Sequence, residues 1–230
     1  MAHINKKRPN TRLEIVRLAA KLFIEEGYSK TTMKKIADAL DVSPGNITFY
    51  FPTKDHLLAV LVDELFDFQN MLMEKAVEEG EKSLLAYCLE LTTIAAACEE
   101  SEVARDFYLS SYSAAYTLQR IRANDVLKTK RVFGEFCPDW GDEKWIATEN
   151  IVSGIEFATI MTRESETPLA LQIECALDAI LTVYQVPRDV REKKIAKVLA
   201  MDYRAMGVSI LGEFRAYIEK VNEDKLRPYQ

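Results

Sequence analysis

Apolar residues recur at helical spacing along almost the whole chain, and this periodicity restricts the fold more than any other feature. Few residues that break helices interrupt the pattern, since the 230 residues include only 8 Gly and 7 Pro. No segment alternates apolar and polar residues as a half-buried strand does, and we find no internal repeat. The sequence therefore predicts an all-α protein.

The first 54 residues predict a bundle of three short helices. Apolar positions between Leu13 and Phe23 form the first helix, which ends at Gly27, a residue suited to a left-handed backbone. Thr31 or Thr32 can cap the second helix. This helix is about two turns long, and its expected inner face consists of Met33, Ile36, Ala37 and Leu40.

A tight turn leads into the third helix. Asp41 tolerates a left-handed backbone, Ser43 can cap a helix, and Pro44 suits a first helical position. Ile47 and Phe51 lie one turn apart and should face inward. The residues left for solvent or a ligand are Asn46, Thr48, Phe49 and Tyr50. Two short helices across a tight turn are typical of a helix-turn-helix, whose second helix fits a major groove about 12 Å wide.

Charge is distributed unevenly along the chain. The net charge is -6, but residues 1–54 hold ten Lys or Arg against five Asp or Glu, and residues 55–230 carry -11. A basic head on an acidic body suits a nucleic-acid partner, because such partners respond to local charge. An uneven scatter of surface charge explains the numbers equally well, so the motifs must decide.

The stretch from Arg12 to Leu57 resembles the DNA-binding domain of the TetR family of transcriptional regulators. The matching residues are Ala20, Leu22-Phe23, Gly27-Tyr28, Thr31-Thr32, Ile36-Ala37, Val42-Ser43, Gly45, Tyr50-Phe51-Pro52, Lys54 and Leu57-Leu58. The resemblance implies a helix-turn-helix DNA-binding domain at residues 1–54. It also implies a C-terminal helical ligand-binding and dimerisation domain at residues 55–230.

The resemblance further implies two kinds of DNA contact in the head. The residues expected to donate to phosphates, and so to position the head, are Thr32, Ser43, Tyr50 and Lys54. The residues expected to contact base edges and specify sequence are Asn46, Thr48 and Phe49. The family usually has Tyr where this chain has Thr48, so a backbone contact is weakened or a base preference is changed.

The sequence of the body predicts one long helix followed by seven others. The long helix runs from His56 to just before Gly80 and connects head to body. Pro138, Pro168 and Pro187 mark breaks. The later helices are expected at 82–99, 101–113, 115–137, 142–163, 169–185, 189–204 and 207–222.

The body also supplies candidates for a small-molecule pocket. Aromatic side chains lie there among small residues, which suits an apolar or aromatic ligand between helices, although plain core packing explains each of them equally well. The candidates are Cys88, Phe107, Tyr108, Tyr112, Tyr116, Trp145, Glu149, Phe157 and Met161. Glu149 and Glu156 share one face of their helix and can hold a cationic ligand if that face is buried. A partly exposed helix flank is the alternative.

Dimerisation in the family typically uses two late helices, and the best candidates are 142–163 and 169–185. The second of these helices has few polar positions, as expected for a helix buried from two sides. The helices after Pro187 either cap the body or join the interface.

The inventory of reactive residues argues against an enzyme. The only two histidines are His3 and His56, and the sequence has no Glu-x-x-His pair, phosphate-binding glycine loop or nucleophile elbow. The four cysteines lie far apart, so we expect them to be reduced and mostly buried. We therefore expect no catalytic residue, no metal and no cofactor. No stretch approaches the ~20 apolar residues that cross a bilayer, so we expect no membrane partner and a cytoplasmic location.

The function expected from these features is transcriptional repression. A homodimer would place two heads on a double-stranded DNA operator, and a small-molecule effector would release it. An activator, a regulator controlled by a protein partner and a helical enzyme with a DNA-binding tether remain alternatives. A structural protein that does not bind DNA would leave the basic head and the rim from Tyr50 to Lys54 unexplained.

Overall fold

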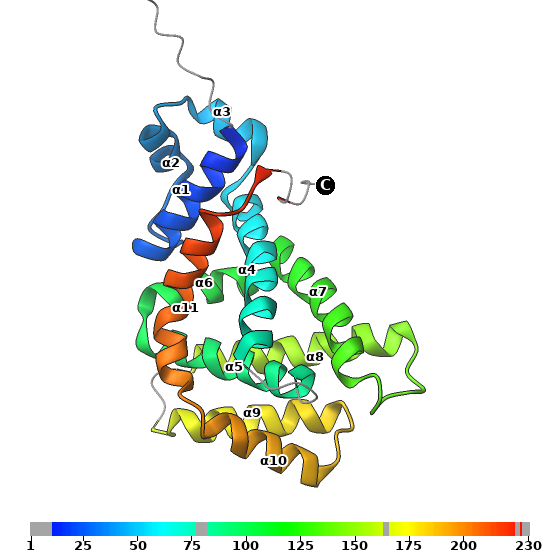
Figure 1. Ribbon diagram of the computed structural model, residues 1–230. Coiled ribbons are helices and arrows are strands. Elements are labelled where there is room, and N and C mark those ends of the chain that lie inside the picture. The colour runs from blue at the N-terminus through cyan, green and yellow to red at the C-terminus, as the bar shows by residue number, and fades with distance from the viewer. Residues whose placement is uncertain (1–10, 77–81, 163–165, 224–225, 227–230) are drawn as a thin grey trace, which may run out of the picture.

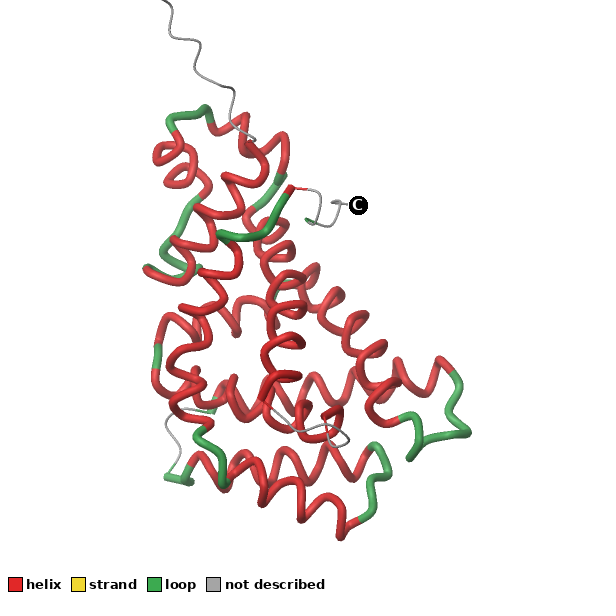
Figure 2. Tube along the Cα trace, viewed as in Figure 1, coloured by secondary structure: helices red, strands yellow, loops and turns green. Residues whose placement is uncertain are grey.

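The computed structural model describes residues 11–76, 82–162, 166–223 and 226. These residues form eleven α-helices and no strand, which confirms the predicted all-α fold (Figure 2). The helices are α1 (Thr11–Glu25), α2 (Met33–Leu40), α3 (Pro44–Tyr50), α4 (Lys54–Ala76), α5 (Lys82–Glu100), α6 (Glu102–Ser113), α7 (Ala115–Phe133), α8 (Asp142–Met161), α9 (Leu169–Val183), α10 (Arg188–Leu199) and α11 (Tyr203–Ile218).

The head consists of α1 to α3, and its helix ends follow the local sequence. Gly27, just after α1, has a φ of 100°, and Asp41, just after α2, has a φ of 54°. Thr32 caps α2 by accepting the Lys35 amide at 3.1 Å. Ser43 caps α3 by accepting the Asn46 amide at 3.3 Å. The predicted caps and left-handed positions are therefore confirmed.

Helix α4 leaves the head and runs the length of the upper body (Figure 1). Inside the body, α5 is the central helix and packs against α4, α6, α7, α8, α9, α10 and α11. Its buried Thr92 and Thr93 donate to the carbonyls of Cys88 and Leu89, both at 2.7 Å, so the interior of α5 buries no unpaired hydroxyl at these positions.

Several helix boundaries differ from those expected. α7 ends at Phe133 instead of 137, because the chain turns there and the Phe136 amide donates to the Phe133 carbonyl at 2.9 Å. The expected pair 189–204 and 207–222 is α10 and α11, and the break between them falls at 200–202 instead of 205–206. The physical reason is Asp202, which caps α11 by accepting the Ala205 amide at 3.3 Å.

The two last helices have different roles. α10 covers α9, whereas α11 returns along α5 and reaches α1 of the head (Figure 1). Arg17 on α1 donates to the Val221 carbonyl at 2.9 Å, and Arg12 donates to the Leu226 carbonyl at 3.4 Å. Arg215 on α11 pairs with Glu25. The end of the chain therefore ties the body to the head.

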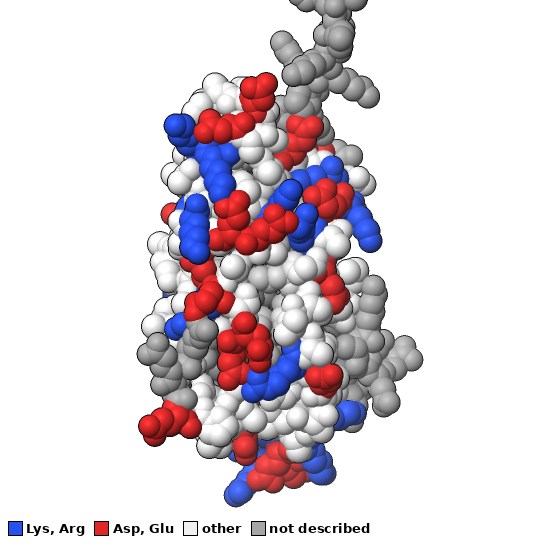
Figure 3. Space-filling view, turned by 90° about the vertical axis from the view of Figure 1, so that its left-hand side faces the viewer, with Lys and Arg blue, Asp and Glu red and all other residues white. Residues whose placement is uncertain are grey.

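The described part of the head carries a smaller net positive charge than residues 1–54 as a whole. Residues 11–54 hold seven Lys or Arg and five Asp or Glu, and both signs are visible over the face in Figure 3. The remaining basic residues, Lys6, Lys7 and Arg8, lie outside the described residues, as does His3.

Cys88, Cys98 and Cys137 are buried and Cys175 is exposed, and all four are free thiols. Across the described ranges, no helix combines the length and the apolar character that a bilayer crossing requires.

Candidate nucleic-acid interface and effector pocket

Helix α3 presents Asn46, Thr48 and Phe49 outward, as the sequence predicts. Ile47 and Phe51 have no exposed surface and anchor the helix in the head. Asn46 and Thr48 are exposed, and Phe49 is 80% exposed. Tyr50 is half-buried and packs against the core, so it is less accessible than the sequence predicts.

The capping residues flank this face. Thr32 and Ser43 are exposed, and each hydroxyl oxygen accepts a backbone amide at the start of its helix. A hydroxyl that accepts in this way keeps its proton for another acceptor. Both caps can therefore donate to a phosphate next to the positive helix end.

Lys54 has a structural role that the sequence did not predict. Its ammonium donates to the carbonyls of Tyr28 at 2.9 Å and Thr31 at 3.0 Å and lies 3.9 Å from the centre of the Tyr28 ring. Burial lowers the pKa of Lys54, although Asp106 and Asp55 oppose the shift. An ammonium has three donors. The expected phosphate contact would use the third.

A loop contact joins the head to the body. Asp106 on α6 accepts the Ser29 amide at 2.8 Å and also bonds the Ser29 hydroxyl. Tyr28 bonds Asp55 at the start of α4. The orientation of the head thus depends on α4, α6 and α11.

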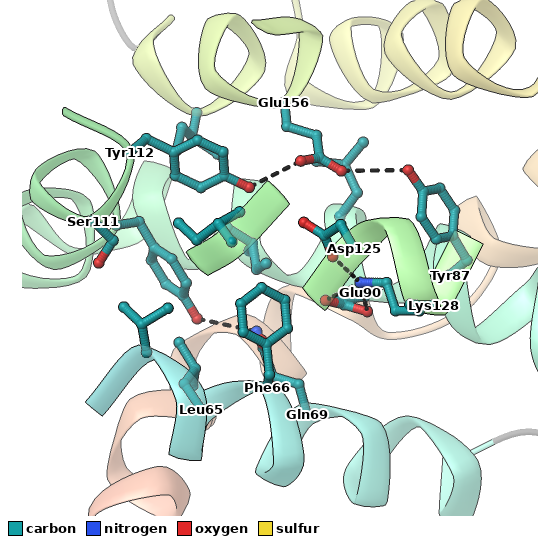
Figure 4. Close-up of a pocket in the computed structure, with 16 residues that line it drawn as sticks. Leu65, Phe66, Gln69, Tyr87, Glu90, Ser111, Tyr112, Asp125, Lys128 and Glu156 are labelled. Carbon is teal, nitrogen blue, oxygen red and sulfur yellow. Dashed lines mark hydrogen bonds and ion pairs between the residues drawn. The ribbon is translucent and has the colours of Figure 1, made fainter. Parts of the chain in front are cut away.

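A cavity of about 40 Å³ lies inside the body, between helices α4 to α8 (Figure 4). One wall is apolar and comes mainly from α4 and α5, with residues Val62, Leu65, Phe66, Leu91 and Ile94. The opposite end is polar and is formed by Tyr87, Glu90, Tyr112, Asp125, Lys128 and Glu156. Gln69 and Tyr108 form a further pair, with the amide donating to the hydroxyl at 3.4 Å.

The polar end gathers carboxyl groups from three helices. Glu156 on α8 accepts from the hydroxyls of Tyr112 at 2.9 Å and Tyr87 at 3.3 Å. Lys128 on α7 lies 3.0 and 3.1 Å from the two carboxylate oxygens of Glu90 and 2.9 Å from Asp125 Oδ1. These groups are buried, so their charges interact strongly.

Glu149 extends this cluster behind the cavity. It accepts from the Tyr184 hydroxyl at 2.9 Å. One carboxylate oxygen from each of Asp125, Glu149 and Glu156 lies within 4.8 Å of the others. Burial and then Asp125 raise the pKa of Glu149 to about 8. Burial, then Asp125 and Glu149, raise the pKa of Glu156 well above its usual value.

Comparison with known proteins matches the head to a described family. Residues 15–61 match the family described as bacterial regulatory proteins, tetR family. This match covers the head and the start of α4. The helix-turn-helix of the head is α2 and α3, and the position of α3 agrees with the resemblance read from the sequence.

Two curated relatives that match part of this chain are named as transcription regulators. The HTH-type transcriptional regulator YuxN of Bacillus subtilis (strain 168) is 33% identical over 82 residues, 35% of this chain and 28% of that protein. The HTH-type transcriptional regulator HbdR of Aromatoleum sp. (strain CIB) is 29% identical over 111 residues, 48% of this chain and 47% of that protein. The matches thus span less than half of these relatives.

Among solved structures, that of TylP, a tetR regulator from Streptomyces fradiae, resembles this chain with a TM-score of 0.49 and 18% identity. The alignment covers 89% of this chain and 97% of TylP.

The pocket candidates from the sequence are scattered. Of the nine, Tyr108 and Tyr112 line the cavity. Glu149 lies behind it, and because Glu149 is 1% and Glu156 8% exposed, the exposed-flank alternative is excluded. The other six do not line the cavity. Cys88 and Phe107 are fully buried in the core, and Met161 is 45% exposed. The remaining three contact other rings: Tyr116 packs near His56, Trp145 contacts Trp140 and Tyr184, and Phe157 packs beside Tyr112.

Sequence reasoning missed Asp125, Lys128, Glu90 and Tyr87. A signal for Asp125 exists, because α7 buries every fourth residue: Thr117, Ile121, Asp125, Thr129 and Phe133. A carboxylate at the centre of such a stripe must be buried and paired. No comparable pattern marks Glu90 and Tyr87 in the apolar sequence of α5.

Proposed function

We propose that this protein belongs to the tetR family and is a DNA-binding transcription regulator, and more specifically a repressor that a small-molecule effector releases. The outward face of α3 carries the proposal, since Asn46, Thr48 and Phe49 project from a helix that Ile47 and Phe51 fix in the head. The match at residues 15–61 and the regulator relatives support it. Binding to chromosomal DNA would place the protein in the cytoplasm.

The proposed division of labour assigns residues 1–54 to DNA binding and residues 55–230 to effector binding and dimerisation. The cavity supports a controlled regulator, because its apolar wall includes Val62, Leu65 and Phe66 of α4. The same helix begins at Lys54, whose ammonium is bonded inside the head. An effector that moves α4 would therefore reorient the reading helix, which is the coupling that release requires.

The test of DNA binding distinguishes residues that position the head on the duplex from residues that specify the base sequence. Asn46→Ala should change the preferred sequence, losing about 1–2 kcal/mol of discrimination at one base pair, because base-edge contacts specify. Tyr50→Phe should weaken binding to all duplexes by a similar factor, because phosphate contacts only position. The measurement is selection of duplexes from a random pool, followed by titrations at several salt concentrations. An absence of binding to any duplex at low salt would refute the proposed function.

We propose that α8 and α9 pair with the same helices of a second copy. Both helices expose small or apolar residues: α8 exposes Ala147, Ile151, Gly154, Ala158 and Met161, and α9 exposes Leu171, Cys175 and Ala179. Asn150 on α8 and Glu174 and Asp178 on α9 are exposed beside them. Small residues let helices approach closely, and Ile151 is 60% exposed at the centre of this surface.

Ile151→Glu is expected to weaken the dimer about 30-fold, or ~2 kcal/mol, since a charge would be buried at the centre of the interface. Analytical ultracentrifugation over a concentration series measures the change. Val208→Glu is the control, because Val208 is 69% exposed on α11 and lies outside the proposed surface. Equal effects of the two substitutions would place the interface elsewhere.

A further inference from the structure

The cavity is lined as a site for a ligand with one charged end and an apolar body. Side chains of α4 and α5 provide the apolar wall, and groups from α5 to α8 converge at the other end (Figure 4). Sites with this division bind amphiphilic molecules, because the polar groups fix orientation and the apolar wall provides burial.

The charged end of the cavity has an excess of negative groups. Glu90, Asp125 and Glu156 line it, Glu149 lies directly behind, and Lys128 is the only cationic side chain among the described residues of the lining. Lys128 is shared between Glu90 and Asp125. Nearby, Arg122 donates to the Ser153 hydroxyl at 3.0 Å. A cationic group is therefore the ligand chemistry that would balance the cluster.

Two carboxyl groups remain available for a ligand. Asp125 is 4% exposed, and its Oδ1 contacts the Lys128 ammonium at 2.9 Å without a hydrogen bond. Glu156 is held toward the cavity by hydrogen bonds from Tyr87 and Tyr112. Figure 4 shows the Asp125 and Glu156 carboxyl groups turned toward one another. An ammonium group between them would complete the coordination of both.

We propose that the effector is an organic ammonium ion with an apolar body. Its ammonium group lies between Asp125 and Glu156, and its body lies along Leu65, Phe66 and Ile94. This inference rests on the proposed function, because only a ligand-controlled regulator needs an effector. The alternative cation, a hydrated divalent metal, would leave the apolar wall without a role.

The size of the cavity connects binding to movement. A volume of about 40 Å³ holds about three water molecules, which is enough for an ammonium group but not for an apolar chain. The body of the ligand must therefore push the wall outward. Since α4 carries Leu65 and Phe66 and enters the head at Lys54, this displacement moves the head.

Binding should release a proton. The titratable groups around Glu156 are Tyr87 and Glu90 on α5, Tyr112 on α6, Asp125 and Lys128 on α7, and Glu149 on α8, with Arg122 and Tyr184 facing Glu149. Burial, then Asp125 and Glu149, raise the pKa of Glu156, so its carboxyl group holds a proton up to a higher pH than an exposed glutamate does. The incoming ammonium stabilises the carboxylate, and the proton leaves to solvent. Affinity should then rise with pH, up to tenfold per unit for one proton released.

Calorimetric titration of the full-length protein with butyl- to decylammonium tests the inference, with the alcohol and the carboxylate of each chain length as matched probes. We expect saturable binding of at least one ammonium, at least tenfold weaker binding of its alcohol and no binding of its carboxylate. Titration in two buffers of different ionisation enthalpy should reveal a proton released at pH 7.

Glu156→Gln should weaken ammonium binding at least tenfold, abolish proton release and leave alcohol binding unchanged. Asp125→Asn serves as a second variant, and Glu143→Gln, on the exposed first turn of α8, is the control. The inference is overturned if no ammonium binds, if the alcohols bind equally well, or if Mg²⁺ or Ca²⁺ binds in place of the amines.

Measuring the release of a bound duplex distinguishes a failure of this inference from a failure of the proposed function. A protein that binds a selected duplex but is not released by an ammonium ion keeps its proposed function and loses this effector class. A protein that binds ammonium ions but no duplex keeps the site and loses the proposed function.

Discussion

Replacing Lys128 by methionine should lower the free energy of unfolding by about 3–5 kcal/mol at pH 8, the cost of removing one partner from a buried ionic cluster. Lys128 lies 2.9 to 3.1 Å from carboxylate oxygens of Asp125 and Glu90, which are 4% and 9% exposed. Although burial disfavours its charged form, Asp125 and Glu90 raise the pKa of Lys128. Methionine fills a similar volume but leaves both carboxylates without a counter-charge.

The loss should be smaller at pH 5. Burial raises the pKa of Glu90, and Lys128 opposes that rise. Without Lys128 the pKa of Glu90 rises further above its unfolded value, so the folded variant binds a proton that the unfolded chain releases. When a carboxyl group has a raised pKa in the folded state, the free energy of unfolding falls as pH increases, by about 1.4 kcal/mol per pH unit for one proton. Urea unfolding at pH 5, 6.5 and 8 measures the slope.

Lys130→Met is the matched control on the same helix. Lys130 pairs with Asp142 at 2.7 Å, but the Asp142 side chain is 86% exposed. Exposed ion pairs contribute about 0–1 kcal/mol, so this variant should unfold almost as the parent does. If the two variants lose equal stability, or if the Lys128 variant shows no pH dependence, the charges at the cavity are better solvated than their burial indicates.

Gly207→Ala should destabilise the protein by about 2–3 kcal/mol through overpacking between α11 and α5. A β-carbon at Gly207 would lie 2.8 Å from the Ala97 amide nitrogen, 2.9 Å from the Thr93 carbonyl oxygen and 2.9 Å from the Ala96 β-carbon. Two of these atoms belong to the backbone, so no side-chain rotation relieves the contact and the helices must separate.

Gly212→Ala, on the same helix, should have the opposite sign. A β-carbon there meets nothing within 4 Å. Alanine in a helix interior is favoured over glycine by about 0.5–1 kcal/mol, so this variant should be more stable than the parent. Thermal and urea unfolding of both variants gives the difference. A stabilised Gly207 variant would mean that α11 packs less closely on α5 than the structure places it.

The head follows from sequence because its determinants are local. Caps such as Thr32 and Ser43 act within three residues, and the left-handed positions Gly27 and Asp41 act at a single residue. The inward positions of Ile47 and Phe51 follow from helical periodicity alone. The same local rules predicted most helix ends of the body and failed where Asp202 was overlooked as a cap.

The pocket depends on which helices meet, and periodicity within one helix contains no such information. Glu90, Asp125 and Glu156 come from α5, α7 and α8, and only packing brings their carboxyl groups to one cavity. Packing likewise turned Lys54 toward the carbonyls of Tyr28 and Thr31. The sequence by itself determined the helices, their caps and the exposed face of α3, since each depends on neighbours along the chain. The tertiary structure decided the cavity, its charges and the contact of α11 with the head, since each depends on contacts between residues distant in sequence.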